Sequence, residues 1–401
     1  MEFLKDTEIV IQMLMVDFKT FHKKKTVAQR KKTNKILKNI YDKINDANNK
    51  TRMLWDSSEI YKTTKNVNNV TIQDSIFLPE EICKYISTHI IKKISYTCKI
   101  CNRDILFTFY IPEHDMFNKT DNITKKMIMW LFFILPYART ECAKTLKITS
   151  YLTPFKKTLP ENNSTILGPK YVNTAFTYRC QDNGEIIIYR MEEIFKVFLH
   201  ETFHTFGLDW SDGSHSNKLA NNIKKLFPIS SDMKIAESYC EFWACFMNSI
   251  FTAYHLTDGY NVDEFLIYSE YCLSFERLFS LLQTVKILRF MSLTYQDLHN
   301  ATHAKEYKEN TNVFVYYILK YLYLFNVDDF LEWCFKNNNN MIAFDANKDN
   351  FSKLLQFIKS RYNSKDFIHM LDYGNMLLDK HNNIFIKNTM RLSILDFSLI
   401  N

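Results

Sequence analysis

Residues 194–206 read IFKVFLHETFHTF, an apolar run that contains two histidines and one glutamate. In an α-helix, side chains four residues apart lie on the same face, so His200 and His204 can reach one metal ion. Glu201 lies one position further around the helix, close to a water molecule on such a metal. The pattern H-E-x-x-H on a helix is typical of zinc-dependent hydrolysis, with the histidines as ligands and the glutamate as general base. This stretch therefore predicts a helix, a metal site and a base together.

The two histidines leave this site incomplete, because a catalytic zinc usually has three protein ligands and one open position. The extended motif H-E-x-x-H-x-x-G-x-x-H has its glycine at Gly207, which also predicts the end of the helix. Its last position is Trp210, which cannot bind zinc, and Asp209, Asp212 and His215 lie nearby without the required spacing. The third ligand is therefore expected further along the chain. Asp209 remains an alternative ligand, or an outer carboxylate, meaning one that binds a ligand histidine and not the metal itself.

A second apolar helix supplies the better candidates. Residues 235–251 read IAESYCEFWACFMNSIF, and the helix is predicted to begin at a cap formed by Ser231 or Asp232. Glu237 and Glu241 are the only charged residues of this run, and burying a carboxylate without a partner is costly. Zinc and its histidine ligands would offset the cost of burying both carboxylates, which lie on one helix face. We expect Glu237 to be the third ligand and Glu241 to accept a hydrogen bond from a ligand histidine, although the reverse assignment stays open.

With both helices in place, the chain resembles the zincin metallopeptidases of the gluzincin type, in which HExxH is followed by a glutamate on a later helix. The segment Glu-Ser-Tyr-Cys-Glu (237–241) is similar to a pattern of that group, which implies Glu237 as the ligand. The overlap of Glu-Phe-Trp-Ala (241–244) with a variant of the pattern would instead imply Glu241. Residues 151–160 and the helical C-terminal part also look like uncharacterised metallopeptidase-like proteins of large DNA viruses. The specific motifs lie within residues 145–250.

The resemblance implies a zinc-dependent metallopeptidase that binds one Zn²⁺ ion, acts on a peptide or protein, and uses Glu201 as general base. No motif that would grip a free substrate amine is present, which favours an endopeptidase over an exopeptidase. Tyr260, Tyr268 and Tyr271 follow the second helix as candidates for the residue that stabilises the oxyanion, and nothing selects among them. A catalytically silent zincin-fold protein, which binds a partner or belongs to a virion, is the alternative.

The expected fold class is α+β, with a zincin-like core over residues 76–285. The chain has only 6 glycines and 7 prolines, which favours a helix-rich protein over a sandwich or barrel. A helical, basic N-terminal segment and linker (1–75) and a helical C-terminal region (286–401) are expected to flank the core. Residues 44–75 are rich in Asn, Asp, Thr and Ser and are interpreted as a loop or linker.

The core is expected to contain a small, mostly antiparallel sheet. Residues 94–111 alternate as a hairpin with its turn near Cys98–Cys101, and a single CxxC pair of this kind is unspecific as a metal site. A further strand begins at Leu146. Residues 171–178 and 185–190 are predicted as a hairpin, and its first strand could pair with an extended peptide substrate.

The composition of the chain indicates which partners it could bind and in which cellular compartment it is expected. The net charge is +7, and part of the excess lies at Lys23, Lys24, Lys25 and Arg30–Lys32. Such a run could bind nucleic acid or an anionic surface, although it is more often a solvated helix face. The nine cysteines form no framework pattern, which predicts reduced thiols in an intracellular compartment, such as a host cytoplasm or a virion, rather than secretion. No membrane insertion is expected, since the longest apolar run is Met127–Pro136.

Overall fold

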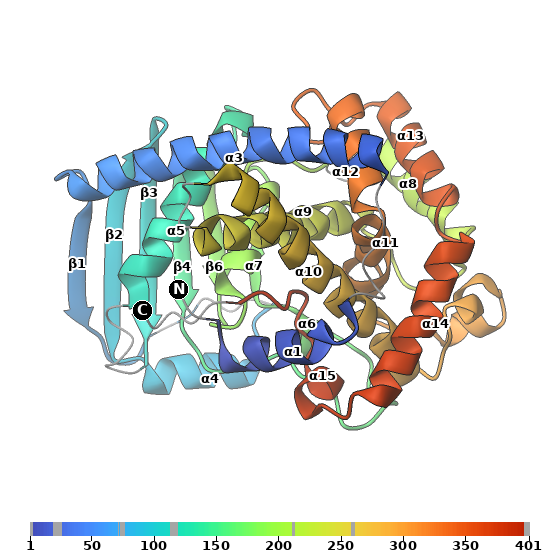
Figure 1. Ribbon diagram of the computed structural model, residues 1–401. Coiled ribbons are helices and arrows are strands. Elements are labelled where there is room, and N and C mark those ends of the chain that lie inside the picture. The colour runs from blue at the N-terminus through green and yellow to red at the C-terminus, as the bar shows by residue number, and fades with distance from the viewer. Residues whose placement is uncertain are drawn as a thin grey trace.

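The computed structural model describes residues 3–18, 26–70, 72, 77–112, 119–210, 213–257 and 261–396. A six-stranded sheet with the order β1-β2-β3-β4-β6-β5 lies at one end of the molecule (Figure 1). Its strands are β1 (Tyr61–Asn66), β2 (Lys92–Ile100), β3 (Arg103–Ile111), β4 (Thr145–Tyr151), β5 (Ala175–Thr177) and β6 (Asn183–Ile188). The sheet is mixed: β4 is parallel to β3 and β6, and the other neighbouring pairs are antiparallel. The predicted α+β class is confirmed.

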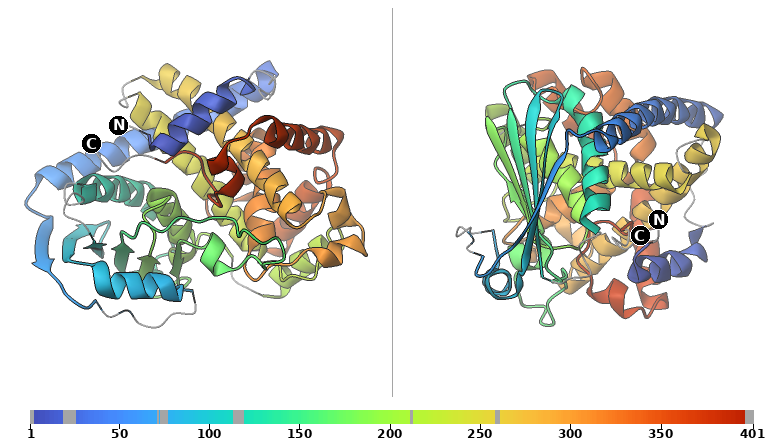
Figure 2. Two further views of the ribbon diagram at one scale, coloured as in Figure 1. Left: turned by 90° about the horizontal axis from the view of Figure 1, so that it is seen from below. Right: turned by 90° about the vertical axis from the view of Figure 1, so that its left-hand side faces the viewer.

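Helices cover both faces of the sheet and form a larger helical body beside it (Figures 1 and 2). Those of the first half are α1 (Lys5–Met15), α3 (Val27–Asp56), α4 (Glu80–His89), α5 (Lys119–Ile134), α6 (Pro169–Val172), α7 (Ile194–Thr205) and α8 (Ser214–Lys224). Those of the second half are α9 (Ile235–Leu256), α10 (Val262–Phe290), the π-helical turn η5 (Phe314–Leu319), α11 (Lys320–Phe325), α12 (Val327–Asn337), α13 (Lys348–Lys359), α14 (Lys365–Lys380) and α15 (Ile384–Asn388). Short 3₁₀ turns are η2 (Leu135–Tyr137), η3 (Gln296–His299) and η4 (His303–Glu306).

Alternation along the strands explains why the sheet is covered on both sides. In β3, Phe107 and Phe109 belong to the main hydrophobic core, whereas the next residue, Tyr110, packs against a smaller cluster that includes residues of α4. The predicted hairpin over 94–111 is confirmed, and its turn consists of Cys101 and Asn102, both with positive φ. Such a conformation is the one that two-residue hairpin turns require.

The N-terminal region is more regular than expected. The predicted loop over 44–75 is wrong for its first part, because α3 continues to Asp56 and β1 extends the sheet. A capping box between Thr26 and Gln29 starts α3. Ile44, Ala47, Thr51 and Leu54 are buried at helical spacing, so the many Asn and Asp residues fall mainly on the other faces of the helix.

The proposed division at residues 75/76 and 285/286 stays a prediction. Helix α10 continues through position 285. One hydrophobic core includes residues from all three segments, among them Leu37, Phe107 and Leu354. Of the basic N-terminal run, Lys23, Lys24 and Lys25 lie outside the described residues, and the chain at Arg30–Lys32 is exposed on α3.

The strand predicted over 171–178 is much shorter in the structure. Pro169 starts the helical turn α6, as proline often does at a first helical position, and strand geometry is limited to Ala175–Thr177. This β5 pairs antiparallel with β6 and forms the edge of the sheet. The predicted hairpin partner and edge position are therefore confirmed over three residues.

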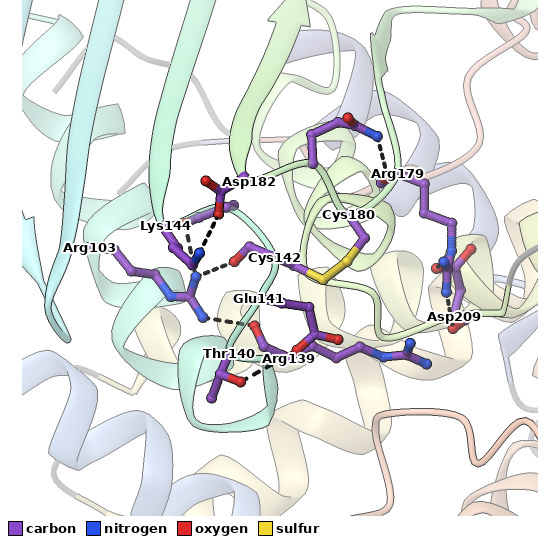
Figure 3. Close-up of a disulfide and its surroundings, with 12 residues drawn as sticks. Arg103, Arg139, Thr140, Glu141, Cys142, Lys144, Arg179, Cys180, Asp182 and Asp209 are labelled. Atoms are coloured by element: carbon purple, nitrogen blue, oxygen red, sulfur yellow. Dashed lines mark hydrogen bonds and ion pairs between the residues drawn. A yellow bond between two sulfur atoms is a disulfide. The ribbon is translucent and has the colours of Figure 1, made fainter.

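The expectation that all nine cysteines are free thiols is wrong, because Cys142 and Cys180 form a disulfide (Figure 3). The two are 38 positions apart in the sequence. They become neighbours because β4 and β6 run parallel, so that the segments before these strands meet, and Ala143 N donates to the carbonyl of Gln181 at 2.7 Å.

Within the described ranges, no helix combines the length and the hydropathy that crossing a membrane requires.

Helix α7 lies close against the sheet at Gly184 of β6. A Cβ atom at this position would lie 2.7 Å from Cβ of Ala143 and 3.0 Å from Cγ2 of Thr205. We expect Gly184→Ala to lower the free energy of unfolding by about 1–3 kcal/mol, because overpacking forces the backbone to shift. Urea denaturation measures this change. Gly213→Ala is the matched control, since its added methyl group meets nothing within 4 Å. Equal midpoints for wild type and both variants would contradict the close approach.

Candidate metal centre

Helix α7 carries the HETFH sequence and is buried along nearly its whole length. It ends as predicted at Gly207, which has φ of +65°. Gly207 N donates to the carbonyl of His204 at 3.1 Å, and Leu208 N donates to the carbonyl of Phe203 at 2.9 Å. These two bonds form a Schellman motif, which satisfies the last carbonyls of a helix. The histidines therefore lie in the final turns of a rigid, buried element.

The two histidines and Glu237 bring their side-chain ends together. Nε2 of His200 and Nε2 of His204 are 3.2 Å apart. Oε2 of Glu237, which lies on the neighbouring helix α9, is 3.2 Å from Nε2 of His200 and 3.4 Å from Nε2 of His204. Helix α9 starts at Ile235 without a side-chain cap, so the predicted cap at Ser231 or Asp232 is wrong.

The other ring nitrogen of each histidine faces a carboxylate. Nδ1 of His200 lies 2.8 Å from Oε2 of Glu241, and Nδ1 of His204 lies 3.0 Å from Oδ2 of Asp209. A carboxylate only accepts hydrogen bonds, so a neutral histidine that carries its proton on Nδ1 would present a lone pair at Nε2. The two Nε2 atoms and one carboxylate oxygen converge on one point, an arrangement that a bound cation would stabilise.

The spacing of these three atoms fits a metal ion. Bonds of about 2.0–2.1 Å to a tetrahedral centre place the ligand atoms about 3.3–3.4 Å from one another. The observed separations of 3.2, 3.2 and 3.4 Å agree with this value. His200, His204 and Glu237 could therefore hold a metal ion. A second group of potential ligands, His204 with Asp209 and Cys240, shares a histidine with the first.

Both outer carboxylates are themselves held by cations. Nζ of Lys196, four residues before His200 on α7, lies 2.7 Å from Oε1 of Glu241, and both side chains are buried. Nε of Arg179 donates to Oδ1 of Asp209 at 2.9 Å.

The carboxylates also affect the titration of His200. Burial acts to lower the pKa of His200, but its contacts with Glu237 and Glu241 outweigh burial and raise that pKa to about 9.

The candidate metal centre opens into a cleft of about 450 Å³. Among the residues that line it are His200, Glu201, His204, Glu237, Tyr316 and the edge strand β5. The carboxyl group of Glu201 makes no hydrogen bond or ion pair with any residue that the structure describes, and burial raises its pKa.

The structure separates the two glutamates of α9. Glu237 faces both Nε2 atoms, whereas Glu241 contacts the outer side of His200. Asp209 likewise contacts the outer side of His204. Trp210, which replaces the histidine of the extended motif, is buried against Tyr239 and Phe344. Asp212 lies outside the described residues, and His215 packs near Phe351 on α13.

Tyr316 is the cleft residue that sequence reasoning missed. Its hydroxyl donates to Oε2 of Glu237 at 2.8 Å, and its ring centre is 5.8 Å from that of His200. Of the tyrosines named as candidates, Tyr268 and Tyr271 are exposed on α10, and Tyr260 lies outside the described residues. Tyr316 lies in the π-helical turn η5, a feature that is frequent at functional sites.

Comparison of the chain with protein families, curated proteins and solved structures found no significant match.

We expect the wild-type protein to retain about one metal ion per chain after equilibration with Zn²⁺ or Co²⁺ and dialysis, because three donor atoms converge. His204→Ala and Glu237→Ala should each lose this ion, as measured by elemental analysis of the dialysed protein. His303→Ala is the control, since this exposed histidine contacts only Asp297 among the pairs described. Full metal retention in both variants would rule out the centre.

Proposed function

We propose that the protein is a zinc-dependent metallopeptidase of the gluzincin type, with His200, His204 and Glu237 as zinc ligands. The observation that carries this proposal is the convergence of the two Nε2 atoms and Oε2 of Glu237 in a cleft that also contains Glu201. Two histidines and one carboxylate are a donor set that catalytic zinc uses in peptidases.

A zinc ion bound there would lower the pKa of a water molecule and polarise the carbonyl group of a scissile bond. Glu201 is the proposed general base, because its carboxyl group lines the cleft beside the ligands. Burial raises the pKa of Glu201, which brings it closer to the working pH, where a base can both accept and return a proton. It would take the proton of the attacking water and deliver it to the leaving amine.

The edge strand β5 is the proposed binding site for the substrate backbone. Ala175, Phe176 and Thr177 line the cleft, and among the strands that the structure describes only β6 pairs with β5, which leaves the other side of β5 unpaired there. The unpaired side could bind an extended peptide by main-chain hydrogen bonds, the way in which many domains bind segments without regular structure of their own. This placement favours a peptide over a compact small molecule as substrate.

Tyr316, which also lines the cleft, is proposed to take part in the reaction. Its hydroxyl donates to the same oxygen of Glu237 that faces the histidines, so it lies beside the reacting groups. A hydroxyl at this place can orient Glu237 and can donate a hydrogen bond to charge that develops on the substrate carbonyl. The three tyrosines named from the sequence are not needed for this role.

We expect Glu201→Gln to retain bound zinc and to lose peptide hydrolysis by about 10²–10⁴-fold, because the amide cannot accept the proton. Cleavage of a fluorogenic peptide library, together with metal content, measures both properties. Glu185→Gln makes the same charge change at an exposed position of β6 and should leave both unchanged.

Two outcomes would contradict the proposed reaction. Full activity of Glu201→Gln would exclude Glu201 as the base. Stoichiometric zinc in the wild type, with no cleavage of any peptide in the library, would favour a catalytically silent protein that binds a partner.

Tyr316→Phe should keep the metal and lower kcat by about 10–1000-fold, since one hydrogen-bond donor near the reacting carbonyl is removed. The Michaelis constant should change much less, because the ring remains in the cleft. Tyr268→Phe is the matched control, as this hydroxyl lies on the exposed side of α10. A normal kcat in Tyr316→Phe would exclude a role of this hydroxyl in the reaction.

A further inference from the structure

The disulfide Cys142–Cys180 lies next to the end of helix α7 that carries His204. Cys180 N donates to the carbonyl of His204 at 3.1 Å. Sγ of Cys142 lies 3.1 Å from the place where a Cβ atom of Gly207 would be. Both halves of the disulfide therefore contact the last turn of the helix or the residue that ends it.

Arg179, the residue before Cys180, extends to Asp209 (Figure 3), which in turn contacts His204. Its Nε donates to Oδ1 of Asp209 at 2.9 Å, and its second terminal nitrogen donates to the Asp209 carbonyl at 2.8 Å. The other carboxylate oxygen of Asp209 lies 3.0 Å from Nδ1 of His204. Arg179 thus fixes both the main chain and the side chain of the residue that orients His204.

The opposite half of the disulfide is fixed to the sheet. Arg103 of β3 donates to the carbonyls of Arg139, Cys142 and Ala143 (Figure 3). The disulfide connects this fixed corner to the loop that carries Arg179. The loop has other supports: Ala143 N donates to the carbonyl of Gln181 at 2.7 Å, Cys180 N donates to that of His204, and the exposed pair of Lys144 with Asp182 contributes little. The disulfide is the covalent link among them.

We propose that Arg179 is a positioning residue of the metal centre, and that the Cys142–Cys180 disulfide holds it there, so that reduction of this bond accelerates metal release. The inference rests on the proposed metal centre and adds redox sensitivity to it. Arg179 has a quarter of its side chain exposed, whereas Asp209 is buried. An arginine on a loop keeps such a contact only if the loop has few alternative conformations, and a cross-link removes many of them.

The redox step is an ordinary thiol–disulfide exchange with a dithiol reductant. The reductant supplies two electrons and two protons, the S–S bond breaks to give two thiols, and the reductant becomes a disulfide. Cys180 is half-buried and Cys142 is buried, so a small thiol can approach from the Cys180 side. No metal ligand is itself oxidised or reduced.

The test measures how fast Zn²⁺ leaves the loaded protein in the presence of excess chelator, followed by the absorbance of the zinc–chelator complex. Arg179→Met should release Zn²⁺ about 10–100-fold faster than wild type, which is the usual effect of removing an outer partner of a ligand histidine. Arg179→Lys should recover part of the difference, because it keeps the charge. Arg289→Met is the control, since it removes a bidentate pair with Asp379 outside the cleft.

The disulfide is tested with Cys142→Ser/Cys180→Ser, and with wild type that has been reduced by dithiothreitol and desalted without oxygen. Both should release Zn²⁺ faster than oxidised wild type, whereas Cys101→Ser, at an exposed free cysteine, should not. If the bond acts through Arg179, adding Arg179→Met to the serine pair should give no faster release than Arg179→Met alone. The visible spectrum of the Co²⁺ form should change in the same variants, because the orientation of His204 changes.

Three outcomes would overturn the inference, and they differ from failure of the proposed function. Wild-type release from Arg179→Met would exclude the positioning role. Wild-type release from the serine pair, or effects that add in the combined variant, would exclude the disulfide as its support. In all three cases zinc binding by wild type would leave the metal centre intact. A wild-type protein that takes up no Zn²⁺ would remove the centre and this inference together.

Discussion

The convergence of three electron-pair donors, Nε2 of His200, Nε2 of His204 and Oε2 of Glu237, is the constraint on which the surrounding structure depends. Groups of this kind are not stable together in a buried place unless a cation lies between them. In the absence of a metal, protons on the histidines have to take that role, in agreement with the raised pKa of His200. The site therefore favours a bound positive charge. The neighbouring carboxylates and their cationic partners hold the histidines in the orientation that this charge needs.

The charged groups next to the centre are also paired, and one of them binds the C-terminal segment. Glu193, which precedes α7, accepts hydrogen bonds from Leu392 N and Ser393 N and pairs with the buried Lys157. The C-terminal segment is thus tied to the start of the helix that carries the histidines. Buried pairs of this kind add little net stability, since desolvation offsets much of their attraction. Their effect is to allow one arrangement only, because any other would leave a buried charge without a partner.

The candidate ligands could be proposed from the sequence because His200 and His204 lie on one helix and the two glutamates on another, where a spacing of four residues fixes relative position. The same rule could have found Lys196. It is the only cation in the run 194–199 and lies one turn before His200, so it also needed a buried partner. Which of Glu237 and Glu241 faces the two Nε2 atoms depends on how α9 is rotated against α7, and only packing determines that rotation.

Other features depend on contacts between distant segments. Tyr316 belongs to a run, FVYYILKYLY, in which no spacing distinguishes one tyrosine from another, and its direction follows from a π-helical turn. Cys142 and Cys180 are joined only because two parallel strands bring their preceding segments together. Residues 44–56 were misjudged for a different reason: their composition is polar, but their few apolar side chains keep helical spacing. Periodicity was the better guide there than composition.

The supports of the two histidines differ in kind, and this difference has a physical consequence. Glu241 and its partner Lys196 lie on two buried helices that pack directly against each other, so the His200 side is fixed by the core. Asp209 and its partner Arg179 lie on connecting segments, and Arg179 is partly exposed. Local opening starts where few buried contacts hold a segment. The His204 side is thus the half of the centre that solvent, reductants or a bound partner can influence, while the His200 side keeps its geometry.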